Sequence, residues 1–123
     1  MAVPILKQGP VLIASIQTAL TDTDVLQLQD DVMAQVTRHR SRGIIVDVTA
    51  LDVMDSFVSR SLQGIARMTR LRGATTVIVG IQPEVAFAMV QLGMAFEDVL
   101  TALDLEEGLA LLQAIREPGD VGT

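Results

Sequence analysis

Two short apolar segments, each followed by a helix-like pattern, constrain the fold of this chain more than any other feature. The segments are residues 44–48 and 75–79, and both are nearly continuous in apolar or β-branched side chains. Strands that are buried on both faces have this character, and they occur in parallel sheets covered by helices. The two segments therefore predict an α/β fold.

The rest of the chain continues this alternation of strands and helices. Two strands at residues 5–8 and 11–16 flank the turn signal Gly9-Pro10, and another short strand is predicted over residues 99–101. Apolar residues at intervals of three and four predict four helices. For three of these helices the residues expected on the inner face are Val25, Leu28, Val32 and Val36; Val58, Leu62, Ile65 and Leu71; and Leu105, Leu109, Leu112 and Ile115. The third helix is predicted to continue through Val85, Ala86, Met89 and Val90.

The signals at the ends of these segments agree with one domain. Polar residues at 21–24 and 104–107 suit helix starts, and Pro83 suits the first position of the third helix. The order of elements predicts a mixed, mostly parallel sheet covered by helices. We assign this single domain to residues 1–117 and expect residues 118–123 to form a flexible C-terminal tail.

The composition excludes several classes of function. A net charge of −6 argues against nucleic-acid binding, which needs a positive surface. The absence of cysteine excludes a disulfide framework, a thiolate zinc site and a cysteine nucleophile, and a single histidine, His39, excludes a histidine-rich metal site. No segment is apolar over the roughly 18–20 residues that a membrane span requires. We expect a cytoplasmic protein without a nucleic-acid or membrane partner.

The common catalytic and nucleotide-binding motifs are also missing. The sequence has no Walker A motif and no G-x-G-x-x-G, G-x-S-x-G or H-E-x-x-H pattern. Asp47, Asp52 and Asp55 leave open a phospho-aspartate receiver that uses magnesium, but residues 14–17, where such a site needs further acids, contain none. Turn and capping roles are the simpler interpretation. We predict that the protein is not an enzyme and holds no cofactor or metal.

Basic residues concentrate in the middle of the chain. On the predicted second helix, Arg60, Gln63, Arg67 and Arg70 recur at helical spacing and form an outward stripe. The stripe is either a solvated helix face or a docking face for an acidic partner or for another copy of the chain. The sequence does not separate these two interpretations.

Ser56 stands where the second helix is expected to begin. A serine at this position is typical of a helix cap. A phosphoserine there would also be stabilised by the free N–H groups and the positive end of the helix dipole. Arg60, one turn later, could reach such a phosphate, whereas Asp52 and Asp55 would repel it. Ser56 is therefore both a candidate cap and a candidate phosphorylation site.

The loop around Ser56 carries a family resemblance. Residues 46–57, which read Val-Asp-Val-Thr-Ala-Leu-Asp-Val-Met-Asp-Ser-Phe, resemble the signature of STAS domains, the fold of bacterial anti-anti-sigma factors. Residues 4–7, 80–86, 92–93 and 101–109 support the resemblance. Typical members read D-S-S-G or D-S-T-G at the serine. Here Phe57 and Val58 follow Ser56, and in this respect the chain looks like the stressosome branch of the family.

The resemblance implies a STAS fold with helices packed on one side of the sheet. It also implies a non-catalytic scaffold and negative regulator that sequesters an RsbT-type serine/threonine switch kinase and releases it when phosphorylated under stress. The other implied partners are RsbR-type STAS paralogues, an RsbX-type phosphatase, and further copies of the chain in a dimer or larger assembly. The alternative is a conventional anti-anti-sigma factor that binds an anti-sigma kinase alone.

The resemblance also assigns site residues. By motif position the phosphoacceptor is Ser56, and Ser59 and Ser61 rank lower because they do not match the motif. The residues expected to contact partners are Asp52, Asp55, Phe57, Arg60 and Arg67.

Overall fold

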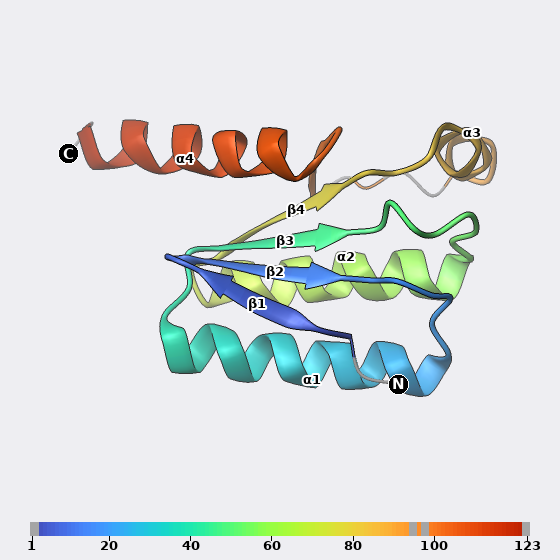
Figure 1. The fold of residues 1–123 in the computed structure, drawn as a ribbon, viewed down its shortest axis with the longest axis horizontal. Coiled ribbons are helices and arrows are strands. Elements are labelled where there is room, and N and C mark those ends of the chain that lie inside the picture. The colour runs from blue at the N-terminus through green and yellow to red at the C-terminus, as the bar shows by residue number, and fades with distance from the viewer. Residues whose placement is uncertain (1–2, 94–95, 97–98, 122–123) are drawn as a thin grey trace.

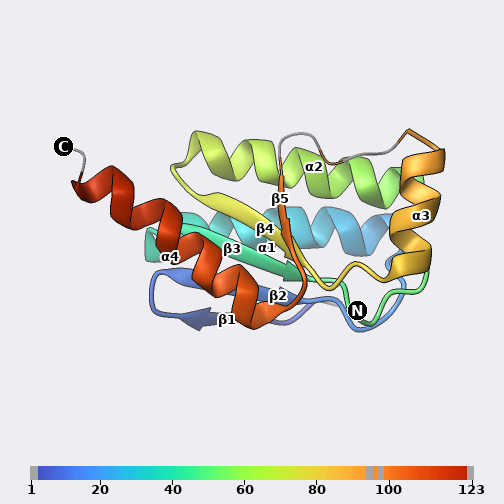
Figure 2. The same ribbon diagram turned by 90° about the horizontal axis from the view of Figure 1, so that it is seen from above.

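The computed structural model describes residues 3–93, 96 and 99–121 of the 123-residue chain, with side chains described as far as Ile115. Its five strands and four helices can be followed in Figures 1 and 2. In chain order these elements are β1 (Ile5–Gln8), β2 (Val11–Ser15), α1 (Asp22–His39), β3 (Gly43–Asp47), α2 (Ser56–Leu71), β4 (Thr75–Val79), α3 (Pro83–Gln91), β5 (Leu100–Ala102) and α4 (Leu105–Val121).

The five strands form one mixed sheet in the order β1-β2-β3-β4-β5. β1 pairs with β2 antiparallel through the hairpin at Gly9-Pro10, and each of the other neighbouring pairs is parallel. In the centre of the sheet, Ile13 is opposite Ile45, which is opposite Val77. The predicted fold class, a mixed and mostly parallel α/β sheet, is confirmed.

Helices cover both faces of this sheet, which corrects the expectation that they pack on one side. α1 and α2 lie side by side against one face, and α4 lies across the other, where it contacts β3, β4 and β5 (Figures 1 and 2). Side chains alternate across a strand, so β3 and β4 present apolar residues to both sides. A second face of this kind must be covered, and α4 covers it.

The two faces bury separate cores. The larger one lies between the sheet and the pair α1 and α2, and the smaller one lies under α4. Leu12, Ile44 and Ile78 belong to the first core, whereas Ile45 and Val77 belong to the second. The larger core holds α2 firmly against β4, and it therefore fixes the position at which α2 begins.

Local signals set the helix ends largely as the sequence predicts. Thr21 Oγ1 accepts a hydrogen bond from the Asp24 N–H at 3.1 Å, and Asp24 Oδ2 accepts one from the Thr21 N–H at 3.0 Å, which is a capping box. At the start of α4, Asp104 Oδ1 accepts from the Glu107 N–H at 2.9 Å. The inner face predicted for α1 is confirmed, because all four of its predicted residues are buried.

Other predictions of inward-facing residues were wrong. Leu71 is 87% exposed, because it lies nine residues beyond Leu62 and thus on the opposite side of a helix with about 3.6 residues per turn. Ile115, near the end of α4, is exposed as well. α3 packs only one narrow side against the domain, and that side carries Val85 and Met89.

Two boundaries also differ from the sequence expectations. β5 begins at Leu100, one residue later than predicted. α4 runs to Val121, beyond the Pro118 at which the predicted tail begins. A proline keeps a φ angle compatible with a helix even though it removes one N–H donor. The flexibility expected of residues 118–123 stays a prediction.

Candidate functional site

The loop between β3 and α2, residues 48–55, leaves the carboxyl end of the sheet and carries the candidate residues. Its first part continues the sheet, because the Val48 N–H donates to the Val79 carbonyl at 3.0 Å. Leu51 and Met54 are both buried in the larger core. Val53, between them in sequence, is 74% exposed. Two buried anchors therefore hold the loop and leave its polar residues in solvent.

A hydrogen-bonded turn fixes the start of this loop. Asp47 Oδ1 accepts from the Thr49 N–H at 2.9 Å and from Thr49 Oγ1 at 2.6 Å. The Thr49 carbonyl in turn accepts from Gln82 Nε2 at 2.8 Å, which ties the loop to the start of α3. Gly80 has φ +81°, and a Cβ atom built there would collide with the Thr49 side chain. The loop is thus locked to the next βα connection.

Asp55, and not Ser56, caps α2. The Asp55 side chain accepts from the Val58 N–H at 2.8 Å, and its backbone is extended, as N-cap residues usually are. Ser56 is the first residue of the helix and is exposed. Of the two roles open to Ser56 in the sequence, the structure gives the cap to its neighbour. The Ser56 hydroxyl lies at the surface, next to the positive end of the helix.

The other two candidate serines are less accessible. Ser59 is 3% exposed, and its Oγ is buried without a hydrogen-bond partner on the inner side of α2. Ser61 is half-buried. A kinase needs to reach the hydroxyl oxygen, so burial disfavours Ser59, the second-ranked acceptor. Accessibility therefore favours Ser56 over both other serines, but it does not favour Ser59 as the second choice.

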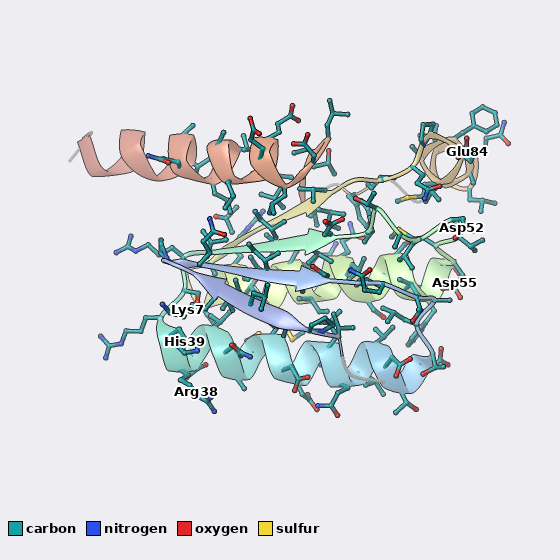
Figure 3. The ribbon with its side chains drawn as sticks, viewed as in Figure 1. Lys7, Arg38, His39, Asp52, Asp55 and Glu84 are labelled. Atoms are coloured by element: carbon teal, nitrogen blue, oxygen red, sulfur yellow. The ribbon has the colours of Figure 1, made fainter. Side chains whose placement is uncertain are left out.

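The predicted partner-binding residues fall on two surfaces. Asp52 and Asp55 are exposed in the loop, at the same end of the molecule as Glu84 of α3 (Figure 3). Arg60 and Arg67 are exposed on α2, two turns apart and on one side of the helix. Ser56 lies one turn before Arg60. The structure therefore brings the candidate acceptor Ser56, the acidic loop and the first arginine of the stripe together.

Phe57 occupies a different environment from the other four. It is half-buried and packs against the larger core. The buried part of its ring therefore anchors the first turn of α2, and the rest of the ring is exposed to solvent. The predicted role in partner binding remains a prediction for the exposed part of the ring.

Sequence reasoning missed an exposed apolar surface at the same end of the sheet. On and just after α3, Phe87 is 66%, Val90 75% and Leu92 70% exposed. Figures 1 and 2 place α3 beside the start of α2. α3 is apolar on most of its circumference and has only Glu84 and Gln91 as polar side chains, so its sequence does not reveal that Phe87 and Val90 face outward.

Two further expectations bear on the type of site. Within the described residues, no three acidic or histidine side chains are grouped in a way that could hold a metal ion. Asp47 and Asp55 serve the local turn and cap described above. Among the helices described, none combines the length and the apolar character that crossing a bilayer requires.

Comparison with known proteins decides the family. The STAS domain family matches residues 2–108, which is most of the chain. The chain belongs to the STAS family. The sheet order, the β3–α2 loop and the serine at the start of α2 are thus features of a single STAS domain.

Two similar solved structures are an RsbS and a chain of a stressosome. A solved serine-to-glutamate variant of RsbS from Moorella thermoacetica is 34% identical, with a TM-score of 0.81 and coverage of 94% of this chain and 97% of that one. A chain of a structure titled "Molecular architecture of the stressosome, a signal integration and transduction hub" is also 34% identical, with a TM-score of 0.79 and coverage of 92% and 98%. The chain resembles RsbS over nearly its whole length.

A curated relative is larger than this chain. The RsbT co-antagonist protein RsbRA of Bacillus subtilis is 30% identical over 83 residues, or 68% of this chain and 30% of that protein. The matched region therefore spans less than a third of RsbRA. These similarities confirm the predicted resemblance to RsbS and to stressosome STAS proteins of the anti-sigma-factor antagonist family.

Proposed function

We propose that this STAS protein is a non-catalytic scaffold of a stressosome assembly in the cytoplasm, and a negative regulator that holds a serine/threonine kinase until Ser56 is phosphorylated. The observation that carries the proposal is the exposure of Ser56 at the first position of α2, directly after the residue that caps the helix. The similarity to RsbS over nearly the whole chain supports it.

The geometry around Ser56 suits a switch that works without refolding. Asp55 already caps α2, so a phosphate on Ser56 would not remove the cap. Phosphorylation adds roughly −1.5 to −2 charges at neutral pH. These charges would lie beside the exposed carboxylates of Asp52 and Asp55. The surface would change from acidic to strongly acidic while the underlying core stays in place.

Arg60 explains how the charge change could affect the binding of a partner. It is exposed one helical turn beyond Ser56 and could pair with a carboxylate of a bound kinase. A phosphate on Ser56 would compete for the same guanidinium and would repel the partner's acidic groups. Because about 1.4 kcal/mol corresponds to a tenfold change in affinity, a modest repulsion is enough to release the kinase.

The proposed partners follow from the relatives. RsbRA is described as an RsbT co-antagonist protein, and the structural neighbour belongs to a stressosome. We therefore assign to this chain an RsbT-type kinase, RsbR-type paralogues and self-association in the assembly. The RsbX-type phosphatase is proposed from the family resemblance alone. The Moorella RsbS was studied with a serine changed to glutamate, a substitution that introduces a negative charge. In this account the protein is the substrate of a kinase and not a catalyst.

The test is phosphorylation by the cognate kinase with ATP, followed by mass spectrometry of the peptide that contains residues 49–60. We expect one phosphate, on Ser56, and none in the Ser56→Ala variant. Ser61→Ala serves as the matched control and should be labelled like the original chain. Labelling of Ser56→Ala at an unchanged rate would contradict the assignment of the acceptor.

Size in solution with an RsbR-type paralogue separates the two family functions. A stressosome scaffold should co-elute with the paralogue in a particle far larger than either chain. A conventional anti-anti-sigma factor should elute as a small species that ignores the paralogue and binds its kinase alone. The second result would favour the alternative function and overturn the scaffold.

A further inference from the structure

A basic cleft lies at the end of the sheet opposite Ser56. It forms where α1 and α2 end, beside the starts of β3 and β4, and it has a volume of about 550 Å³. In Figure 3, Arg38 and His39 mark this end of the molecule. The residues that line the cleft are Val36, Thr37, Arg40, Ser41, Arg42, Arg72 and Gly73.

The charge of this cleft is opposite to that of the whole chain. Arg40, Arg42 and Arg72 are all exposed and line the cleft, so three positively charged residues surround it. The lining residues that the structure describes include no carboxylate. A concentration of positive charge in a concave site raises the local concentration of anions, and it does so here in a protein with a net charge of −6.

A buried hydroxyl in the same wall points to a ligand. Ser41 is 4% exposed, and its Oγ has no hydrogen-bond partner. It lies between Arg40 and Arg42 in sequence and lines the cleft with them. Buried polar groups are nearly always hydrogen-bonded, so a hydroxyl left without a partner beside two arginines requires an explanation. The Oγ is closed to solvent in the position described, so a rotation of the side chain toward the cleft would be needed for an acceptor atom bound there to supply the missing partner.

The backbone at Arg40 adds a second unusual feature. Arg40 is the C-cap of α1 and has φ +51°, the left-handed conformation that glycine or asparagine adopts at lower cost. Basic residues near helix ends also stabilise the helix dipole, which is sufficient to explain Arg38 and His39 in the last turn of α1. It explains neither an arginine in a strained position nor the unpaired Ser41 hydroxyl.

We propose that this cleft binds a compact phosphate anion, with Arg40, Arg42 and Arg72 as donors and the Ser41 hydroxyl as a further donor. Guanidinium groups present paired N–H donors that match the oxygens of phosphate. No aromatic residue is among the described lining residues, so the site offers no stacking surface for a nucleotide base. The ligand class is therefore inorganic phosphate, pyrophosphate or a small phosphorylated metabolite, not a nucleotide.

The test is a calorimetric titration of the full chain with pyrophosphate at constant ionic strength. We expect saturable binding that Arg42→Gln weakens about tenfold, as loss of a charged hydrogen bond predicts. Arg38→Gln is the matched control, because it removes the same charge at the same helix end outside the cleft lining. Binding weakened equally by both variants, or no saturable binding, would overturn the proposal.

Two further measurements locate the ligand and its source. Ser41→Ala should weaken pyrophosphate binding several-fold without lowering the melting temperature, because it removes a hydroxyl that has no partner in the protein; unchanged affinity would contradict the proposed donor. A peptide of residues 50–62 phosphorylated on Ser56 provides the second arm. Tighter binding of this peptide than of pyrophosphate, abolished by Arg42→Gln, would assign the cleft to a protein-borne phosphate and would overturn the free-anion proposal.

Discussion

The two ends of the sheet differ in charge and in the way the chain crosses them. At the amino ends of the parallel strands, α1 and α2 return to β3 and β4 through residues 40–42 and 72–74, and the surface is basic. At the carboxyl ends, the β3–α2 connection takes residues 48–55, and the surface is acidic (Figure 3). The short connections carry arginines, whereas the long and anchored loop leads into α2 at Ser56.

Topology explains much of this polarity. The strands β2, β3 and β4 run parallel, so the helices between them all begin at one end of the sheet and finish at the other. Acidic residues stabilise helix starts and basic residues stabilise helix ends, and a charge difference between the two ends follows. The helix dipole leaves one feature at each end unexplained. These are the exposed Ser56 at one end and the buried, unpaired hydroxyl of Ser41, between two arginines in sequence, at the other.

The largest expected effect separates two glycines, one at each end. Gly80 follows β4 with φ +81° and would place a Cβ against Thr49, whereas Gly73 precedes β4 with φ +83° and open space around it. We expect Gly80→Ala to lower the free energy of unfolding by about 3 kcal/mol and Gly73→Ala by about 1 kcal/mol. Urea denaturation measures both. Equal losses would show that the Gly80–Thr49 contact does not hold the loop.

The next effect concerns negative charge placed at each end. Ser56→Asp should weaken capture of the RsbT-type kinase about tenfold, because it adds charge beside Asp52 and Asp55. Thr37→Asp adds the same charge to an exposed residue at the basic end and should leave capture unchanged. Surface-immobilised kinase gives both dissociation constants. If the two variants behave alike, the kinase is responding to net charge and not to the loop.

A smaller effect distinguishes the two aspartates of the loop. Asp55→Ala removes the hydrogen bond to the Val58 N–H and should lower the free energy of unfolding by about 1 kcal/mol. Asp52→Ala, an exposed loop residue, should change it by less than about 0.5 kcal/mol. Chemical denaturation of the two variants checks the difference. A cap supplied by Ser56 instead would leave both variants equally stable.

The smallest effect tests the strained arginine at the basic end. Arg40→Gly should raise the free energy of unfolding by about 0.5–1 kcal/mol, because glycine adopts the left-handed cap without a Cβ penalty. Arg42→Gly, at the neighbouring position just before β3, has no such strain to relieve and should not stabilise the chain. Thermal unfolding of the pair gives the comparison. A loss of stability in Arg40→Gly would mean that the arginine side chain contributes more to folding than its backbone strain removes.

Strong periodic patterns predicted the elements that define the fold. The segments at β3 and β4 are apolar enough to be assigned as buried strands, and the inner face of α1 follows from its regular spacing. The patterns do not say which helix covers which face. β3 and β4 have apolar residues on both sides, so the position of α4 depends on where the chain emerges from β5, and local sequence does not contain that information.

The sequence predicted where the candidate site lies, but not which of its residues caps α2 and which is exposed. Asp55 and Ser56 are adjacent and can both cap a helix, so the sequence alone left the cap open. The burial of Ser59 depends on the packing of α2 against the sheet. Because serine is polar, its position in the sequence does not predict that it faces inward. The cleft around Ser41 escaped the sequence analysis because its residues come from the ends of two helices that only the folded chain brings together.

The hydrogen bond from Gln82 to the Thr49 carbonyl has a consequence for a partner that binds near the loop of residues 48–55. It couples the backbone of that loop to the first turn of α3, more than thirty residues later in the chain. The outward-facing Phe87 and Val90 are therefore held in a constant position relative to that loop. A partner bound over Ser56 would meet the acidic loop and this apolar surface in one fixed arrangement.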